Sequence, residues 1–534
     1  MLNKKKRSMR EEAHVNYMGG PSYDLSPFMR LYVLATSSFF GESGYYSNVR
    51  ADEDDDSYIG YLSDVFGSYG EEMKSLMSGK NRGEAIVKAV EDSLAYDAAL
   101  TLRFLAWLRK DVFMRATPAV GLAVAARNEN VRGTGLLTAV SGDVFSRLDD
   151  VTNCLAYYLS TYGKPIPNAL KKSMAARIEK ATEYELAKYS KKKNAVSMKD
   201  AINLTHAHSE AVDRFYRGEI SQTTQGQETW EGILSKEGST KEAWTKAVSV
   251  MGHMALLRNL RNLVNAGVDE SLYLDKLVAG VATGKQLPFR YFSAWKHVSS
   301  AAIKDALEKC VDISIKNLPQ LGGRSLILVD NSGSARGTQV SSLSSVSVSV
   351  CGNLMGVLTG LVSDKADIGV FGDEVEYIPI HKGFKETALA MLAVVNSTGS
   401  RVGGSTEHGI WLALDKAIRE KIPYDRIFIY SDMQAGHGGL YGTGGYPVWN
   451  LGRTERYIDV PFLVNKYRQE VNPNCKLYSI QIGGYADNIF PEFYPNTCIL
   501  GGWTPEVLRF VSLYEKNFTT VEEVFREKFG LKKK

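Results

Sequence analysis

The chain has 534 residues, of which 44% are hydrophobic and 23% charged, and its formal net charge is +4. These values are typical of a globular protein and exclude a disordered chain, while the length predicts two or more domains. No apolar run approaches the roughly 18 to 20 residues that cross a bilayer, and none follows the basic start, so we expect a cytoplasmic protein without a signal peptide or a membrane partner.

Helical patterns dominate the chain up to residue 321. Apolar residues recur three and four apart through residues 83–113, which predicts a long helix. The next helix is expected to have Thr117 as its N-cap and Pro118 at its first position. A series of such helices fits the stacked pairs of an α-solenoid or an irregular bundle, because no fixed repeat separates the two.

Further helices are expected in the same part of the chain. Ser197 and Asp200 have the spacing of a capping box. Residues 240–268 predict one helix or a tight pair of helices ended by Gly267, and residues 299–318 predict another.

A basic segment runs from Lys164 to Lys199, with ten Lys and Arg residues against three Glu residues. Excess positive charge of this kind suits a polyanion such as nucleic acid. A solvated helix face is the alternative interpretation of the same residues. The five cysteines are scattered and no two have C-x-x-C spacing, which argues against a zinc site and a disulfide framework.

After Gly322 and Gly323 the pattern changes to short apolar runs that alternate with helical segments. Such alternation predicts parallel βαβ units in a sheet whose strands are buried on both faces. The expected strands are residues 325–330, 366–371, 426–432 and 476–484, and the expected helices are residues 341–362, 385–397, 407–420 and 460–470.

Polar residues follow the first of these strands. Asp330, Ser332 and Ser334 lie in a D-x-S-x-S turn, and in a parallel sheet this places them at the edge where ligands bind. Hydroxyl and carboxylate oxygens suit a hard divalent cation, most readily Mg²⁺, with Mn²⁺ or Ca²⁺ as alternatives. Thr406 and Asp432 are candidates for completing the site.

The five residues Asp330, Ser332, Ser334, Thr406 and Asp432 resemble the metal-ion-dependent adhesion site of a von Willebrand factor A domain. The resemblance implies a Rossmann-like domain, a bound cation and capture of an acidic group rather than catalysis. We therefore expect no enzymatic activity.

The helical part resembles the TROVE module in "YMGGPSYDLSPFMRLYVLATSSFFGESGYY", in "LRKDVFMRATPAVGLAVAA" and most closely in residues 166–208. With the von Willebrand A pattern, this is the arrangement of the Ro 60 kDa autoantigen family and its bacterial or phage relatives. The implied domains are a basic tail at 1–18, a TROVE domain at 19–321 and a von Willebrand A domain at 322–534.

The resemblance implies HEAT-like helical repeats closed into a monomeric ring. Its outer basic surface binds Y-like RNA, its central hole takes single-stranded 3′ ends of misfolded or immature RNA, and an exoribonuclease is a partner in RNA quality control. The implied RNA-binding residues are Lys171, Lys172, Lys188, Lys192, Lys193 and His206. The candidates for lining the hole are Arg115, Arg258 and Arg261, for each of which a structural ion pair is the alternative.

Two other functions remain open at this point. The chain could be a metal-dependent adaptor that captures an acidic protein ligand, in which case the basic segment is incidental. It could also be a metal-dependent phosphodiesterase, although neither His408 nor His437 has a nucleophile at useful spacing.

Overall fold

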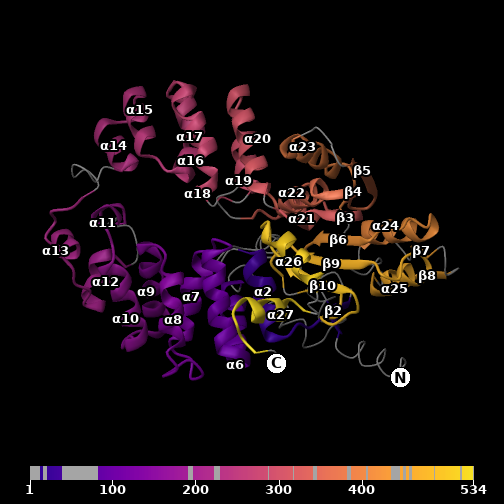
Figure 1. The fold of residues 1–534 in the computed structure, drawn as a ribbon, viewed down its shortest axis with the longest axis horizontal. Coiled ribbons are helices and arrows are strands. Elements are labelled where there is room, and N and C mark those ends of the chain that lie inside the picture. Colours follow the sequence, from indigo (N-terminus) through magenta and orange to yellow (C-terminus); the bar gives the residue numbers. More distant parts are fainter. Residues whose placement is uncertain are drawn as a thin grey trace, which may run out of the picture. The chain divides into compact units, whose positions relative to one another are not determined.

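The computed structural model divides the chain into two compact units (Figure 1). Val87–Ser314 form the helical unit, and Ile315–Lys534 with the residues up to Ile86 form the sheet unit. The structure describes residues 13–15, 21–38, 82–189, 196–221, 229–284, 286, 288–316, 318–340, 346–381, 387–404, 407–434, 446–448, 453–455, 460–485, 487–516 and 520–532. None of the described helices is long and apolar enough to cross a membrane.

The helical unit is a run of mostly short helices (Figure 1). They are α6 (Arg82–Lys110), α7 (Ala116–Ala125), α8 (Leu136–Val144), α9 (Leu148–Tyr162), α10 (Asn168–Glu179), α11 (Glu183–Lys188), α12 (Met198–Thr205), α13 (Glu210–Tyr216), α14 (Trp230–Glu237), α15 (Lys241–Val250), α16 (His253–Asn265), α17 (Leu274–Ala279), α18 (Val281–Gly284), α19 (Pro288–Lys296) and α20 (Ala301–Ile315), with a 3₁₀ turn, η1 (Glu270–Leu272). Contacts join α7 to α9, α8 to α10, α10 to α12 and α11 to α13, so helices two apart in the chain stack on one another. Such stacking buries one apolar face of each helix.

The predicted helix ends are partly confirmed. The Ser197 hydroxyl accepts from the Asp200 backbone N–H (3.1 Å) and the Asp200 carboxylate accepts from the Ser197 N–H (2.9 Å), which is the expected capping box. Residues 240–268 form the tight pair α15 and α16, and Gly267 has the left-handed φ of 70° that ends it. The prediction for Thr117 is wrong, because Arg115 already has helical dihedrals and Thr117 lies buried inside α7.

The long predicted helix is α6, but its backbone is broken at Asp97 (φ −160°, ψ 99°). The Asp97 carboxylate accepts from the Leu100 backbone N–H at 3.0 Å, as an N-cap does, and so starts the second half of α6.

The sheet unit is built on a six-stranded sheet of order β10-β9-β6-β3-β4-β5. All neighbours are parallel except β5, which is antiparallel to β4 at one edge. The chain passes from β3 to β4 and β5 and then returns to β6 on the other side of β3. The connections therefore leave β3 and β6 in opposite directions, and the carboxyl ends of these two strands flank the place where such sheets bind ligands.

The strands of this sheet are β3 (Leu321–Asp330), β4 (Ser363–Phe371), β5 (Val375–His381), β6 (Arg426–Ser431), β9 (Lys476–Gln481) and β10 (Thr497–Gly501). Two short hairpins, β1 (Ala13–Val15) with β2 (Pro21–Tyr23) and β7 (Tyr446–Val448) with β8 (Arg453–Glu455), belong to the same unit. Its helices are α2 (Pro27–Ser37), α21 (Gly333–Gly337), α22 (Val348–Leu361), α23 (Ala388–Gly399), α24 (Glu407–Arg419), α25 (Val460–Glu470), α26 (Glu506–Tyr514) and α27 (Val521–Lys528).

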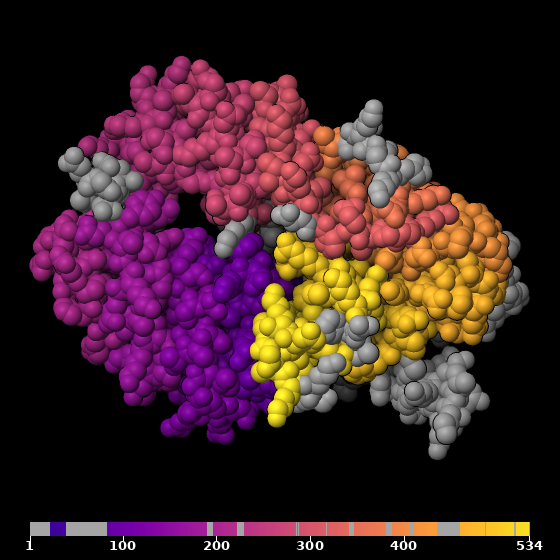
Figure 2. Space-filling view, in the orientation of Figure 1, coloured from indigo at the N-terminus to yellow at the C-terminus, as the bar shows by residue number. Residues whose placement is uncertain are grey.

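Helices cover both faces of the sheet. α22 lies against Ile327 and Val329, where a Cβ on Gly356 would stand 2.4 Å from the Val329 side chain, so glycine allows this close approach. α24 and α25 share a core with Leu326 and Leu328 on the opposite face. Figure 2 shows the orange and yellow segments, from about residue 330 onward, packed into one continuous body.

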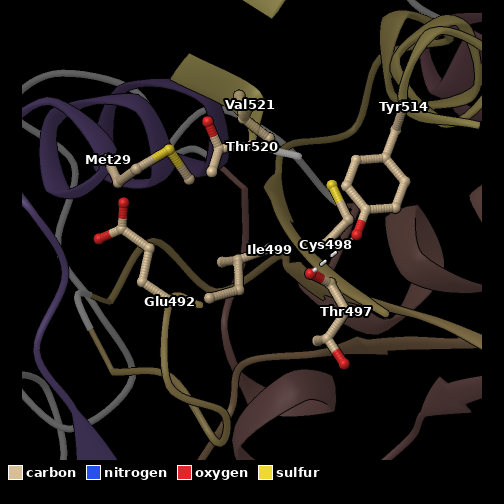
Figure 3. A pocket seen from close by; sticks show the side chains of 8 residues that line it. All are labelled: Met29, Glu492, Thr497, Cys498, Ile499, Tyr514, Thr520 and Val521. Atoms are coloured by element: carbon tan, nitrogen blue, oxygen red, sulfur yellow. Dashed lines mark hydrogen bonds between the residues drawn. The ribbon is translucent and has the colours of Figure 1, made fainter. Parts of the chain in front are cut away.

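The N-terminal helix α2 belongs to the sheet unit. The rings of Phe28 and Phe525 lie edge to face at 5.6 Å, and the Ser26 N–H and hydroxyl donate to the Glu492 carboxylate at 2.5 and 2.9 Å. Figure 3 shows one pocket whose lining combines α2 with C-terminal elements, through Met29, Glu492, Thr497, Cys498, Ile499, Tyr514, Thr520 and Val521. The segment predicted as one domain at 19–321 thus begins with a helix that packs on β10 and α27.

Candidate metal centre and nucleic-acid surface

The first candidate site lies where β3 ends. Asp330 is the last residue of β3 and is fully buried, and its Oδ1 accepts from the Ser332 backbone N–H at 2.8 Å. The chain turns there into the short helix α21, which Ser332 caps, and the hydroxyls of Ser332 and Ser334 lie 3.2 Å apart. The D-x-S-x-S turn therefore gathers three oxygen-bearing side chains at the carboxyl edge of the sheet.

The neighbouring strand β6 brings a second carboxylate to the same place. Asp432 follows the last residue of β6, is 2% exposed and accepts a hydrogen bond from Ser334. The Ser431 hydroxyl donates to Asp330 Oδ2 at 2.6 Å, so the ends of the two strands are bonded directly. Four of the five predicted metal ligands are therefore brought together by the pairing of β3 with β6.

Thr406, the fifth predicted ligand, lies outside the described residues. The backbone just before it is held at the site, because the Gly404 carbonyl accepts from the Gly333 N–H at 2.7 Å. Arg336 of α21 also donates to the Gly403 carbonyl at 2.7 Å.

The electrostatics of the site are those of uncompensated buried acids. Burial raises the pKa of Asp330, and burial together with the charge of Asp330 raises the pKa of Asp432 to about 7. The largest contributions that lower the two pKa values are hydrogen bonds, among them those from Ser431 and Ser332 to Asp330 and from Ser334 to Asp432. Two buried carboxylates beside two hydroxyls form a donor set that fits a divalent cation.

Additional polar residues, which the sequence patterns did not indicate, surround the two aspartates. The Gln434 N–H donates to Asp432 Oδ1 (3.1 Å) while its side-chain amide donates to Asp487 Oδ2 (2.7 Å). Asn331 and Asn353 exchange reciprocal amide hydrogen bonds of 2.9 Å, which tie the D-x-S-x-S turn to α22. The available signal was only the position of Asn331 directly after β3 and of Gln434 shortly after β6.

The acidic residues do not form a cluster that could bind a metal without the hydroxyls. Within the described ranges, no group of three or more His, Cys, Asp or Glu side chains could hold a metal ion. A cation at this site would depend on Ser332 and Ser334.

The second candidate site comprises the basic residues of the helical unit. Lys188 ends α11 and its Nζ lies 5.5 Å from the centroid of the Tyr184 ring. His206 is the exposed C-cap of α12 with a left-handed φ of 58°. Lys171 and Lys172 lie in α10, with Lys172 exposed. Lys192 and Lys193 lie outside the described residues, and their role stays a prediction.

Much of the arginine charge in this part of the chain is neutralised. Arg177 pairs with Glu185, Arg214 with Glu183 and Glu219, and Arg217 with Glu219. By contrast, no carboxylate among the described residues pairs with Lys171 or Lys172. Among the described residues from Lys164 to Glu219, the positive charge available to a polyanion is therefore carried mainly by lysines.

The three arginines proposed for a central hole differ in their surroundings. Arg115 pairs with Asp149. Its contacts are therefore those of a structural ion pair, which was the alternative to lining the hole. Arg258 and Arg261 are exposed on the polar side of α16, and the described part of the chain offers them no ion pair.

Comparisons with known proteins found one family match and a similar solved structure. The TROVE domain family matches residues 217–317. The solved structure of the Deinococcus radiodurans Ro (RSR) protein is similar with a TM-score of 0.52 and 16% sequence identity, over 78% of this chain and 92% of that chain. No curated protein matches the chain.

Proposed function

We propose that this chain is a Ro-type protein and that it binds structured noncoding RNA through the helical unit; its TROVE match at residues 217–317 and the similarity of its fold to a Ro protein support this proposal. The observation that carries this proposal is the pairing pattern of the cations. Arginines near α11 and α13 are neutralised by glutamates, whereas Lys171 and Lys172 on α10 have no carboxylate partner among the described residues. Lysines suit phosphates without selecting a base sequence.

The finer function is proposed from the family resemblance. Y-like RNA would bind the outer basic surface, and single-stranded 3′ ends of misfolded or immature RNA would enter the hole of a monomeric ring of HEAT-like repeats. The protein would act in cytoplasmic RNA quality control with an exoribonuclease and without catalytic activity of its own.

We also propose that the sheet unit is a von Willebrand factor A domain. The strand order with an antiparallel edge and the acidic residues beyond β3 and β6 support this proposal. Ser332, Ser334 and Thr406 would contact a Mg²⁺ ion directly, and Asp330 and Asp432 would balance its charge. When bound, the ion supplies a positive charge that can hold an oxygen ligand.

The test of RNA binding is recovery and sequencing of RNA from a native pull-down, followed by a salt titration of binding to the recovered species. We expect one small structured RNA or RNAs with single-stranded 3′ ends, and an affinity that falls steeply with salt. A pull-down free of RNA, or an affinity independent of salt, would contradict the proposal.

Removal of one buried carboxylate is expected to abolish stabilisation by metal. At a Mg²⁺ concentration 100 times its Kd, the wild type should gain about 2.7 kcal/mol in unfolding free energy. Asp330→Asn should show no such gain, but without metal it should be more stable than the wild type because it relieves repulsion with Asp432.

The measurement is thermal unfolding with Mg²⁺ and with chelator. The exposed carboxylate Glu527 of α27 provides the control, since Glu527→Gln should retain the full metal increment. An equal increment in Asp330→Asn would show that the metal binds elsewhere.

A second candidate function, a metal-dependent adaptor, is favoured by the convergence of Asp330, Ser332, Ser334 and Asp432. It predicts a protein partner that is lost with chelator and with Asp330→Ala, and no salt-dependent RNA affinity. Asp487, which is held beside Asp432 by Gln434, adds negative charge and weighs against an acidic ligand.

A further inference from the structure

A second group of cations in the helical unit lies around the connection between α9 and α10. Arg127, Lys164, Lys171 and Lys172 have no ion pair with the described residues. Arg127, Lys164 and Lys172 are exposed. This group differs from the arginines near α11 and α13, each of which meets a glutamate.

The topology places these cations at one end of a helix pair. Only residues 163–167 separate α9 from α10, so the C-terminus of α9 and the first turns of α10 lie at the same end. Lys164 lies in the connection, and Lys171 and Lys172 lie in the first turns of α10. Arg127 follows α7, which packs on α9.

Aromatic rings lie among these cations. Tyr162, the last residue of α9, has its ring centroid 5.3 Å from that of Tyr158 and 6.4 Å from that of Tyr157. The Arg127 guanidinium lies 5.7 Å from the centroid of the Tyr162 ring. Tyr157 and Tyr162 are partly exposed.

The ring of Tyr162 packs against a buried neighbour, Tyr158, which restricts its position. Tyr158 is fully buried, and its hydroxyl donates to the Pro165 carbonyl at 3.1 Å, which ties the connection to α9. A ring that packs on a buried, hydrogen-bonded neighbour loses little further freedom when a ligand stacks on it.

We propose that Tyr157, Tyr162 and Arg127 form a platform that stacks an unpaired RNA base, and that Lys164, Lys171 and Lys172 bind the flanking phosphates. This inference rests on the proposed RNA binding and adds a base-stacking subsite to it. Aromatic rings and arginine planes accept any base, because every base has a π face, and nearby cations follow the phosphate backbone.

The acidic groups nearby do not oppose this assignment. Glu91, exposed on α6, is the carboxylate that acts on both tyrosines, and the proposed subsite holds four cations. Burial, together with neighbouring charges that include Glu91, raises the pKa of Tyr162 to about 12. The tyrosine hydroxyls therefore stay neutral at physiological pH, and no phenolate repels a phosphate.

The test compares a short labelled oligouridylate with an abasic oligomer of the same length and charge. The full-length wild-type protein should bind the base-containing oligomer about tenfold more tightly at this subsite. Tyr162→Leu, which keeps an apolar side chain against Tyr158, should remove this preference, whereas Tyr162→Phe should keep it. Arg127→Ala should lower the salt slope by about 1.

Tyr216 provides a matched control, because it is 44% exposed and Lys199 Nζ lies 5.3 Å from its ring centroid, but Arg217 and Glu219 follow it. Tyr216→Leu should leave the preference unchanged. Thermal unfolding of each variant separates a local effect from loss of the fold.

The outcomes distinguish this inference from the proposed function. A full preference in Tyr162→Leu, or its equal loss in Tyr216→Leu, would overturn the platform. Salt-dependent binding of both oligomers with equal affinity by the wild type would overturn the platform and leave RNA binding intact. Binding of neither oligomer would overturn the platform, and an additional absence of RNA from the pull-down would overturn the proposed function.

Discussion

Alanine at Lys171, Lys172 and Lys188 together is expected to weaken binding of structured RNA by about 100-fold at physiological salt. Each lysine that neutralises a phosphate releases a counterion, and at about 0.15 M salt this release is worth about fivefold in affinity. Three such contacts multiply to about 100-fold. The salt slope of log K should fall by about 3, because each lost phosphate contact lowers it by about 1.

The measurement is a salt titration of RNA affinity for the wild type and the variant. A triple variant at Lys309, Lys365 and Lys516 removes the same total charge from exposed positions elsewhere. Equal weakening by both variants would mean that net charge, rather than the surface at α10 and α11, controls affinity. Unchanged affinity in the first variant would remove these lysines from the RNA surface.

Methionine at Arg109 is expected to lower the unfolding free energy of the helical unit by about 3–5 kcal/mol. Arg109 of α6 donates to Asp150 Oδ2 of α9 through Nε at 3.0 Å and Nη2 at 2.9 Å. Both side chains are buried, at 8% and 0% exposure. Removal of the guanidinium leaves a buried carboxylate without its hydrogen-bonded counter-charge, and the nearest remaining cation is Arg115, whose Nε lies 3.9 Å from Asp150 Oδ1.

The adjacent residue provides the control. Lys110 pairs with Asp143, but both side chains are exposed, so Lys110→Ala should change stability by about 0–1 kcal/mol. Denaturant unfolding followed by a probe in the helical unit measures both variants. Similar losses for Arg109→Met and Lys110→Ala would contradict the role assigned to burial.

The loss in Arg109→Met should shrink as pH falls. Burial raises the pKa of Asp150 above its usual value even with Arg109 present, and Arg109 acts to lower it. Without the guanidinium the folded state takes up a proton more readily than the unfolded state does, so stability rises as pH falls towards the usual aspartate range. Asp150→Asn combined with Arg109→Met should recover stability at neutral pH.

The two candidate sites lie in different compact units, so the experiments on one site do not depend on the other. The candidate metal residues belong to the sheet unit, and the candidate RNA-binding lysines with the proposed tyrosine platform belong to the helical unit. Variants at Asp330 therefore report on metal binding, and variants at Lys171 or Tyr162 report on RNA binding, without altering the same packed core.

Local sequence patterns predicted elements whose signals lie within a few residues. The capping box of Ser197 and Asp200, the helix pair ended by Gly267 and the buried strand that ends at Asp330 are of this kind. The candidate metal residues were predicted to meet because parallel strands bring their carboxyl ends to one edge, and their role in metal binding stays a prediction. Asp330, Ser332, Ser334 and Asp432 do lie together.

These local patterns could not predict features that depend on contacts between residues far apart in the chain. β5 and β10 are the edge strands of the sheet, held by pairing with β4 and β9 respectively, and the sequence patterns did not predict them. The predicted start of α7 was wrong, because Arg115 already has helical dihedrals although its side chain makes no capping hydrogen bond.

The sequence by itself determined the change from helical to alternating patterns, the periodicity of most helices and central strands, and the residue types at the candidate metal site. Tertiary structure alone decided that α2 packs in the sheet unit, that Arg115 meets Asp149, and that Tyr162 lies near both Tyr158 and Arg127. The physical reason is that periodicity, caps and turns act over a few residues, whereas burial and charge pairing depend on side chains that only the folded chain brings together.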